Sequence, residues 1–242
     1  MSRPAGDRLL QVAHIGRLPY AEALELQRSV ARARISGALA EDVLLLVEHP
    51  PVITCGRSSK AAHLVALPAV LAARGVDVHE IERGGDVTFH GPGQLVGYAI
   101  IDLTRHRQDL HWYLRQLEGA LIAALSMLGI AAERRAGFTG VWVGDRKIAS
   151  IGVHTRDWVT WHGFALNVTT DVRWFDLIVP CGIAGVEMTT VARELERLGS
   201  PRFDLESRAS DAVAVALATV LDLQPVIIPS ASLLDALEPV AH

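Results

Sequence analysis

The sequence predicts an α+β fold, in which several helices accompany a largely antiparallel sheet. The first observation is a succession of three strand-like runs at residues 140–143, 147–154 and 160–168, which are joined by short polar connections. Strands joined in this way form an antiparallel meander. The second observation is a series of leucines at helical spacing from Leu110 to Leu128, preceded by Asp109, a residue type that caps helices.

The remaining elements follow from turn residues and apolar periodicity. Further helices are predicted at residues 20–35, 68–74, from Thr189 or Thr190 to near Gly199, and from Asp204, as a cap, to about Leu221; further strands are predicted at 43–47, 52–55, 76–81 and 95–103. Strict alternation along residues 147–154 would place Lys147 and Ser150 on opposite faces. The tail from Gln224 shows little periodicity, so we assign it no element.

Length and composition limit the class of protein. The chain has 242 residues, half of them hydrophobic, and a net charge of −4. We expect one catalytic domain over residues 1–242, with residues 224–242 the uncertain part. The longest apolar tract is too short for a bilayer and no signal peptide is apparent, so we expect a cytoplasmic protein with neither a membrane nor a nucleic acid as partner. Cys55 and Cys181 are expected to stay reduced.

Lysine is rare in this sequence. The 23 basic residues comprise 21 Arg and only Lys60 and Lys147. Because lysine is a compact ammonium that can lose its proton when desolvated, a chain that otherwise uses arginine points to its lysines as candidates for chemistry. Lys60 lies in a polar run and is predicted to be a solvated loop residue. Lys147 is therefore the candidate catalytic lysine.

Residues 83–94 contain four glycines and one proline. Such a segment can bring backbone N–H groups close to a polar ligand, or it can consist of two hairpin turns. The segment joins two predicted strands and lacks the Gly-Lys-Ser/Thr of a phosphate loop, and its Gly-Pro-Gly does not fit dinucleotide spacing. The sequence therefore supplies no nucleotide-binding motif.

Cys181 is the better nucleophile candidate of the two thiols. Pro180 and Gly182 hold it on a constrained loop, whereas Cys55 lies in a predicted strand, where cysteine usually acts as a small hydrophobe. A reactive thiolate needs a positive neighbour, which could be a lysine or one of the histidines His90 and His162. These histidines have no tight ligand spacing with the cysteine, so we assign no metal site.

Five motifs together resemble the lipoyl(octanoyl) transferase family. The resemblance runs from about Leu44 to Thr190 in one continuous order. Its motifs are Arg83-Gly84-Gly85-x-x-Thr88-x-His90-Gly91-Pro92-Gly93-Gln94, Gly140-Val141-Trp142, Arg146-Lys147-Ile148-Ala149-Ser150-Ile151-Gly152, His162-Gly163-Phe164-Ala165-Leu166-Asn167 and Pro180-Cys181-Gly182.

The resemblance implies a mixed, largely antiparallel sheet flanked by helices, the catalytic fold of biotin and lipoate protein ligases. It implies transfer of an octanoyl group from acyl carrier protein to a lysine of the lipoyl domains of 2-oxoacid dehydrogenases or of the glycine cleavage H protein, with no cofactor and no metal. By the same resemblance Cys181 is the acyl-thioester nucleophile and Lys147 lowers its pKa. The substrate-binding residues it implies are Arg83, Gly84, Gly85, Asp86, Val87, Thr88, Phe89, His90, Ser150, Ile151, Gly152, Gly163, Phe164 and Ala165.

Both protein partners are acidic as a rule in that family, so we expect some of the 21 arginines near the site. Two other functions remain open. An ATP-dependent lipoate or biotin ligase of the same fold would use Lys147 but would not need Cys181. An acyl-binding protein without turnover would need neither residue for chemistry.

Overall fold

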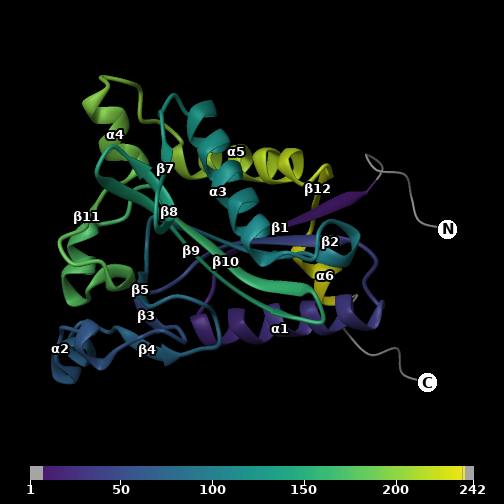
Figure 1. Ribbon diagram of the computed structural model, residues 1–242, viewed down its shortest axis with the longest axis horizontal. Coiled ribbons are helices and arrows are strands. Elements are labelled where there is room, and N and C mark those ends of the chain that lie inside the picture. The colour runs from purple at the N-terminus through teal and green to yellow at the C-terminus, as the bar shows by residue number, and fades with distance from the viewer. Residues whose placement is uncertain (1–7, 236, 238–242) are drawn as a thin grey trace.

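The computed structural model describes residues 8–235 and 237 as two sheets with helices around them (Figure 1). The nine-stranded sheet has the order β12-β1-β2-β6-β10-β9-β8-β7, with β11 also paired to β9, and the three-stranded sheet has the order β4-β3-β5. The strands are β1 (Leu9–Arg17), β2 (Asp42–Glu48), β3 (Val52–Cys55), β4 (Asp77–Glu80), β5 (Val87–His90), β6 (Gln94–Ile100), β7 (Glu133–Arg135), β8 (Phe138–Val143), β9 (Arg146–Arg156), β10 (Val159–Asn167), β11 (Glu187–Met188) and β12 (Gln224–Ile228).

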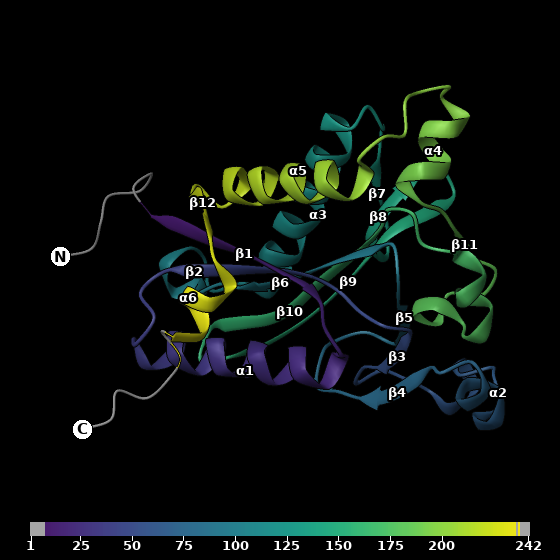
Figure 2. The same ribbon diagram turned by 180° about the vertical axis from the view of Figure 1, so that it is seen from behind.

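Helices cover both faces of the larger sheet, with α3 and α5 on one face and α1 on the other (Figures 1 and 2). The α-helices are α1 (Tyr20–Ser36), α2 (Pro68–Ala73), α3 (Leu110–Met127), α4 (Val191–Arg197), α5 (Leu205–Val220) and α6 (Ser230–Asp235), and the 3-10 turns are η1 (Ala61–His63), η2 (Leu103–Arg105), η3 (Val172–Leu177) and η4 (Pro180–Gly182). Within the described residues no helix combines the length and apolarity needed to cross a membrane.

The predicted meander is confirmed. Strand β9 pairs antiparallel with both β8 and β10, and β10 continues antiparallel to β6. Strand β2 pairs antiparallel with β6 but parallel with β1, so the sheet is mixed and largely antiparallel, as expected. The α+β fold class is therefore confirmed.

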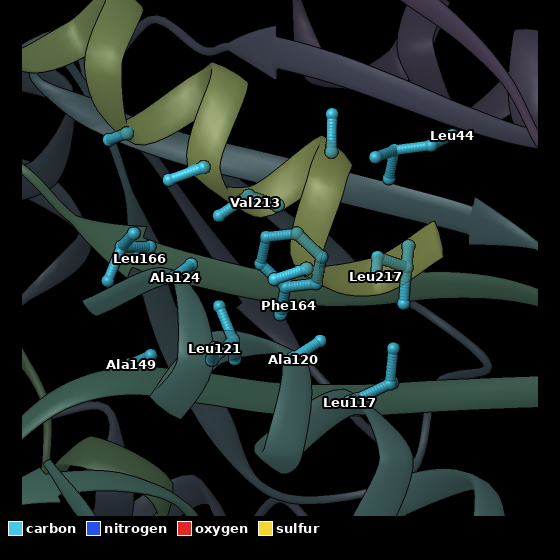
Figure 3. Close-up of a cluster of buried hydrophobic side chains, with 14 of the residues drawn as sticks. Leu44, Leu117, Ala120, Leu121, Ala124, Ala149, Phe164, Leu166, Val213 and Leu217 are labelled. Atoms are coloured by element: carbon cyan, nitrogen blue, oxygen red, sulfur yellow. The ribbon is translucent and has the colours of Figure 1, made fainter. Parts of the chain in front are cut away.

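The main core lies between this sheet and the helices α3 and α5 (Figure 3). Leu117 and Leu121 of α3, Leu217 of α5 and Phe164 of β10 pack together, and all four side chains are buried. Burying side chains of this size contributes about 1.5–3 kcal/mol each. This core fixes β9 and β10, the two strands that carry most of the candidate site.

The predicted helix starts are confirmed, but one of the predicted capping bonds is not made. The side chain of Asp109 accepts a hydrogen bond from the backbone N–H of Trp112, and that of Thr190 accepts one from Arg193. Asp204 was expected to cap α5 in the same way, but its side chain makes no capping bond and its backbone is left-handed at φ 51°. The helix therefore begins where it was predicted, but the predicted side-chain cap was wrong.

Two strand expectations also need correction. The tail from Gln224 forms β12, which pairs parallel with β1 at the edge of the sheet; Pro225 is tolerated because an edge strand need not donate every N–H. The strand expected over residues 95–103 ends at Ile100, where Asp102 turns the chain by accepting a bond from the N–H of Thr104.

Lys147 and Ser150 point to the same side of β9, contrary to the alternation rule. Val141 pairs with Ala149 and Trp142 with Lys147, so an extra residue is inserted between Lys147 and Ala149. Such a β-bulge breaks the two-residue period of the strand. The bulge therefore brings two polar side chains to one place, where both contact Cys181.

Candidate active site

A cavity of about 330 Å³ opens where the three-stranded sheet meets β9 and β10 of the larger sheet. Its walls come from the glycine-rich segment, from β6, β9 and β10, from the start of β8 and from η4. The lining residues are Tyr20, Arg83, Gly85, Asp86, Thr88, His90, Val96, Tyr98, Gly137, Phe138, Thr139, Ser150, Ile151, Gly152, His162, Gly163, Phe164, Ala165, Cys181, Gly182 and Ile183.

Cys181 lies on η4 and borders this cavity. Its backbone is left-handed, at φ 55° and ψ 22°, a conformation that disfavours a residue with a Cβ atom. The turn is held by hydrogen bonds from the N–H of Gly182 to the carbonyl of Val179 and from the N–H of Val179 to the carbonyl of His63. A strained, well-supported backbone is typical of a residue positioned for function.

Lys147 approaches Cys181 closely enough to control its charge. Its Nζ lies 3.1 Å from Sγ of Cys181, and Oγ of Ser150 lies 3.7 Å from the same sulfur. Burial by itself would raise the pKa of the Cys181 thiol, but the charge and hydrogen bond of Lys147, helped by Ser150 and Arg83, hold that pKa below its ordinary value. The site is therefore built to stabilise a thiolate.

The side chain of Lys147 is 1% exposed and passes close to the backbone of Gly140. Its Nζ lies 5.6 Å from the centre of the Trp142 ring, a favourable position for a cation. Gly140 has a φ of 132°, and a Cβ there would come within 2.7 Å of Cε of Lys147. Gly140 and Trp142 thus position the lysine. Neither was among the predicted site residues, although both stand in the Gly140-Val141-Trp142 motif.

The glycine-rich segment contributes five residues to the cavity. Arg83, Gly85, Asp86, Thr88 and His90 line it. On β5 the side chains of Val87 and Phe89 point the other way, into the core of the smaller sheet, because successive residues of a strand face opposite sides. Gly84 does not line the cavity either; its N–H donates to the carbonyl of Val153 and so fixes the segment against β9.

The two histidines near the cavity do not supply the positive charge. Burial lowers the pKa of His90 and that of His162 to about 3, so both rings are neutral near pH 7. Nδ1 of His90 bonds Oε1 of Gln94, 2.8 Å away. Of the neighbours considered from the sequence, Lys147 therefore supplies the charge beside the sulfur.

Arg83 is buried beside the cavity and donates to the carbonyl and hydroxyl oxygens of Thr54, at 2.7 and 2.9 Å. Its guanidinium adds to the positive potential that favours the Cys181 thiolate. A second arginine lies near the mouth, where the Arg135 guanidinium is 5.6 Å from the ring of Phe138, a lining residue.

The two other predicted segments face each other across β9 and β10. Gly152 pairs with Gly163, Ile151 with Phe164 and Ser150 with Ala165, and all six residues line the cavity. Cys55 is half-buried on β3, and burial raises the pKa of its thiol. No group of three or more His, Cys, Asp or Glu in residues 8–235 and 237 is arranged to hold a metal ion.

Solved structures with a similar fold come from ligases. Lipoate-protein ligase A bound with ATP aligns with 96% of this chain and 92% of its own, with a TM-score of 0.75 at 16% identity. A bipartite lipoate protein ligase from Thermoplasma acidophilum, described with its E2 lipoyl domain, aligns over 95% of this chain and 90% of its own, with a TM-score of 0.72 at 16% identity. These similarities show that the fold is the expected ligase-like catalytic fold.

Sequence comparisons identify the family. The model of the lipoyl protein ligase A/B catalytic domain matches residues 19–207, a wider span than the motifs alone indicated. The octanoyltransferase of Acidobacterium capsulatum is 49% identical over 211 residues, which cover 82% of this chain and 85% of that protein. The chain therefore belongs to the lipoyl protein ligase A/B catalytic domain family and is a transferase.

Proposed function

We propose that this enzyme moves an octanoyl group from acyl carrier protein to a lysine of a lipoyl domain, through a thioester on Cys181. The observation that carries the proposal is the 3.1 Å contact between Nζ of Lys147 and Sγ of Cys181 at the edge of a cavity. The acceptors would be the lipoyl domains of 2-oxoacid dehydrogenases and the glycine cleavage H protein.

In the first half-reaction the Cys181 thiolate attacks the carbonyl carbon of the octanoyl thioester. The new C–S bond forms as the carrier's C–S bond breaks, and the carrier leaves as a thiolate. Lys147 can give that thiolate a proton, because the cysteine that needed its positive charge is now acylated. The acyl group stays activated throughout, since one thioester replaces another.

In the second half-reaction the amino group of the acceptor lysine attacks the Cys181 thioester. A C–N bond forms, the C–S bond breaks, and Cys181 leaves as a thiolate. A proton from the attacking amine returns to Lys147, which then stabilises that thiolate again. Conversion of a thioester to an amide is downhill, so this step needs no ATP. The enzyme would therefore work without a cofactor, in keeping with the absence of a nucleotide motif from the sequence.

The cavity offers apolar walls for an acyl chain. Val96 and Ala165 line it from β6 and β10, and Ile151 and Phe164 border it while their side chains pack in the main core. Each CH₂ group transferred from water to such surroundings gains about 0.8 kcal/mol. We assign the octanoyl chain to this cavity, with its carbonyl carbon at Cys181.

An ATP-dependent ligase of the same fold is the alternative. Such an enzyme activates the acid as an adenylate and has no use for a thiolate. The lowered pKa of Cys181 favours the transferase, because burial alone would have kept that thiol neutral.

The test is incubation with octanoyl-acyl carrier protein in the absence of ATP, followed by mass spectrometry. We expect one hydroxylamine-labile octanoyl group on Cys181, and transfer of that group when a lipoyl domain is added. Cys55→Ala is the matched control and should retain the adduct, since Cys55 lies outside the cavity. No adduct in the intact enzyme, or full activity in Cys181→Ala, would disprove the mechanism.

A further inference from the structure

An aspartate and a histidine form a close pair beside the nucleophile. Nδ1 of His63, the last residue of η1, lies 2.6 Å from Oδ2 of Asp86 in the glycine-rich segment. Because a carboxylate oxygen only accepts, the histidine donates this bond. The other oxygen of Asp86, Oδ1, accepts a bond from the N–H of Val87, 2.7 Å away. Both oxygens are thus held in fixed positions.

This pair lies directly against the Cys181 loop. A Cβ atom on Gly182 would come within 2.5 Å of Oδ2 of Asp86 and 3.1 Å of Cε1 of His63. Glycine is therefore required at position 182 for the carboxylate to come so close. Asp86 also lines the cavity together with Cys181, so its carboxylate borders the space where an acyl thioester and its attacker would meet.

The negative charge of Asp86 does not stabilise the Cys181 thiolate. Asp86 is the only acidic residue among the cavity-lining residues, and within the described part of the chain no lysine or arginine lies within 4.0 Å of its oxygens. A carboxylate near a thiol opposes ionisation of that thiol. The site has nevertheless placed this carboxylate, bonded to the ring of His63, beside its nucleophile, where it can also meet a positive charge brought by a substrate.

The acceptor lysine of the second half-reaction brings such a charge. Lysine has a pKa near 10.4, so it arrives as an ammonium, which has no lone pair for attack. Arg83 stays charged after Lys147 has given up its proton, and its positive potential beside Cys181 would repel the ammonium. Without a counter-charge at the entrance, the features that activate Cys181 would disfavour the second substrate.

We propose that Asp86, oriented by His63, binds the ammonium group of the acceptor lysine and accepts its proton. This inference rests on the proposed transfer to lysine. The ammonium gives one proton to the Asp86 carboxylate, and its lone pair then forms the C–N bond as the C–S bond breaks. The bonding electrons pass to Sγ of Cys181, paired with Lys147. The second amine proton returns to Lys147, which gave its own to the carrier thiolate, and the proton held on Asp86 leaves to water.

Asp86→Asn removes the charge while preserving shape. Its Oδ1 can still accept from Val87, and its amide can donate to Nδ1 of His63 if the ring adopts the other tautomer. His63→Gln keeps an amide that can donate to Asp86 but loses the ring that aligns it, so its effect should be in the same direction and smaller. Asp109→Asn is the matched control, because Asp109 caps α3 outside the cavity and asparagine caps equally well.

The experiment first loads Cys181 with octanoyl-acyl carrier protein and then follows loss of the acyl group by mass spectrometry. One portion receives a lipoyl domain, whose lysine is cationic, and another receives hydroxylamine, which is neutral at pH 7.5. We expect Asp86→Asn to lower the ratio of the lysine rate to the hydroxylamine rate at least about a hundredfold, the lower end of the range for general-base catalysis. The lysine reaction of this variant should also recover as pH rises, since free amine then forms in solution.

The other possible outcomes distinguish an error in this inference from an error in the proposed function. If the lysine and hydroxylamine rates fall together, Asp86 only holds the loop and the inference is wrong. If neither rate falls, Asp86 has no part in the second half-reaction. If Asp86→Asn cannot be loaded, the same ratio in His63→Gln decides, and an unchanged ratio there overturns the inference. Failure to load the wild-type enzyme would instead overturn the proposed function itself.

Discussion

Replacing Lys147 by methionine tests the electrostatic basis of the site. Methionine has nearly the length of lysine and a flexible apolar chain, so it can fill the space beside Trp142 without the cavity that alanine would leave. Unit charges 3.1 Å apart attract by about 5 kcal/mol at an effective dielectric constant of about 20. Water that enters in place of the ammonium would recover part of this energy.

Even about 1.4 kcal/mol of lost stabilisation corresponds to a factor of ten in thiolate population. We therefore expect Lys147→Met to slow alkylation of Cys181 by iodoacetamide at least about tenfold at pH 7, with the rate recovering at higher pH as the thiol ionises. Peptide mapping by mass spectrometry distinguishes Cys181 from Cys55, which serves as an internal reference thiol. Lys60→Met, at the only other lysine, controls for loss of a positive charge.

An unchanged Cys181 rate in Lys147→Met, with equal Cys55 rates, would refute the assignment of Lys147 as the group that lowers the thiol pKa. A fall in both rates would instead indicate a general change in the fold. Circular dichroism and thermal unfolding of the variant would identify that case.

Two further predictions concern the buried histidines. His90→Ala should raise KM for the octanoyl donor about tenfold yet leave alkylation of Cys181 unchanged, because the ring is neutral and bonded to Gln94; slower alkylation would contradict this separation of roles. Burial lowers the pKa of His49 to about 4 and the pKa values of His90 and His162 to about 3, so the unfolded chain binds protons first as pH falls below about 6.5. Stability should be full above that pH and decline towards pH 5, by up to about 2 kcal/mol for each histidine. Urea unfolding at pH 7 and pH 5 measures this loss, and equal free energies of unfolding would contradict it.

Much of the local structure was predictable because local rules decide it. Side-chain periodicity and turn residues act over a few residues of sequence. They predict the leucine series of α3, its Asp109 cap and the three strands of the meander. The missing capping bond of α5 was not predictable in the same way. Asp204 has the right residue type, but its left-handed backbone prevents a capping bond, and no nearby residue indicates this.

The bulge on β9 could not be predicted from local sequence rules. Alternation along the strand separates Lys147 from Ser150, whereas pairing with β8 inserts an extra residue and brings both to Cys181. A bulge depends on how two strands register against each other. Strand β12 was missed for a related reason, since its pairing partner β1 lies more than 200 residues earlier in the chain.

The sequence by itself determined the fold class and family, and it identified Lys147 and Cys181 as candidates, because residue types and motif order carry that information. Tertiary structure alone decided that Nζ lies 3.1 Å from Sγ, that Val87 and Phe89 face away from the cavity, and that His63 and Asp86 meet beside Gly182. These are distances between segments far apart in the chain. They are set by the packing of two sheets against each other, which acts only once the whole chain has folded.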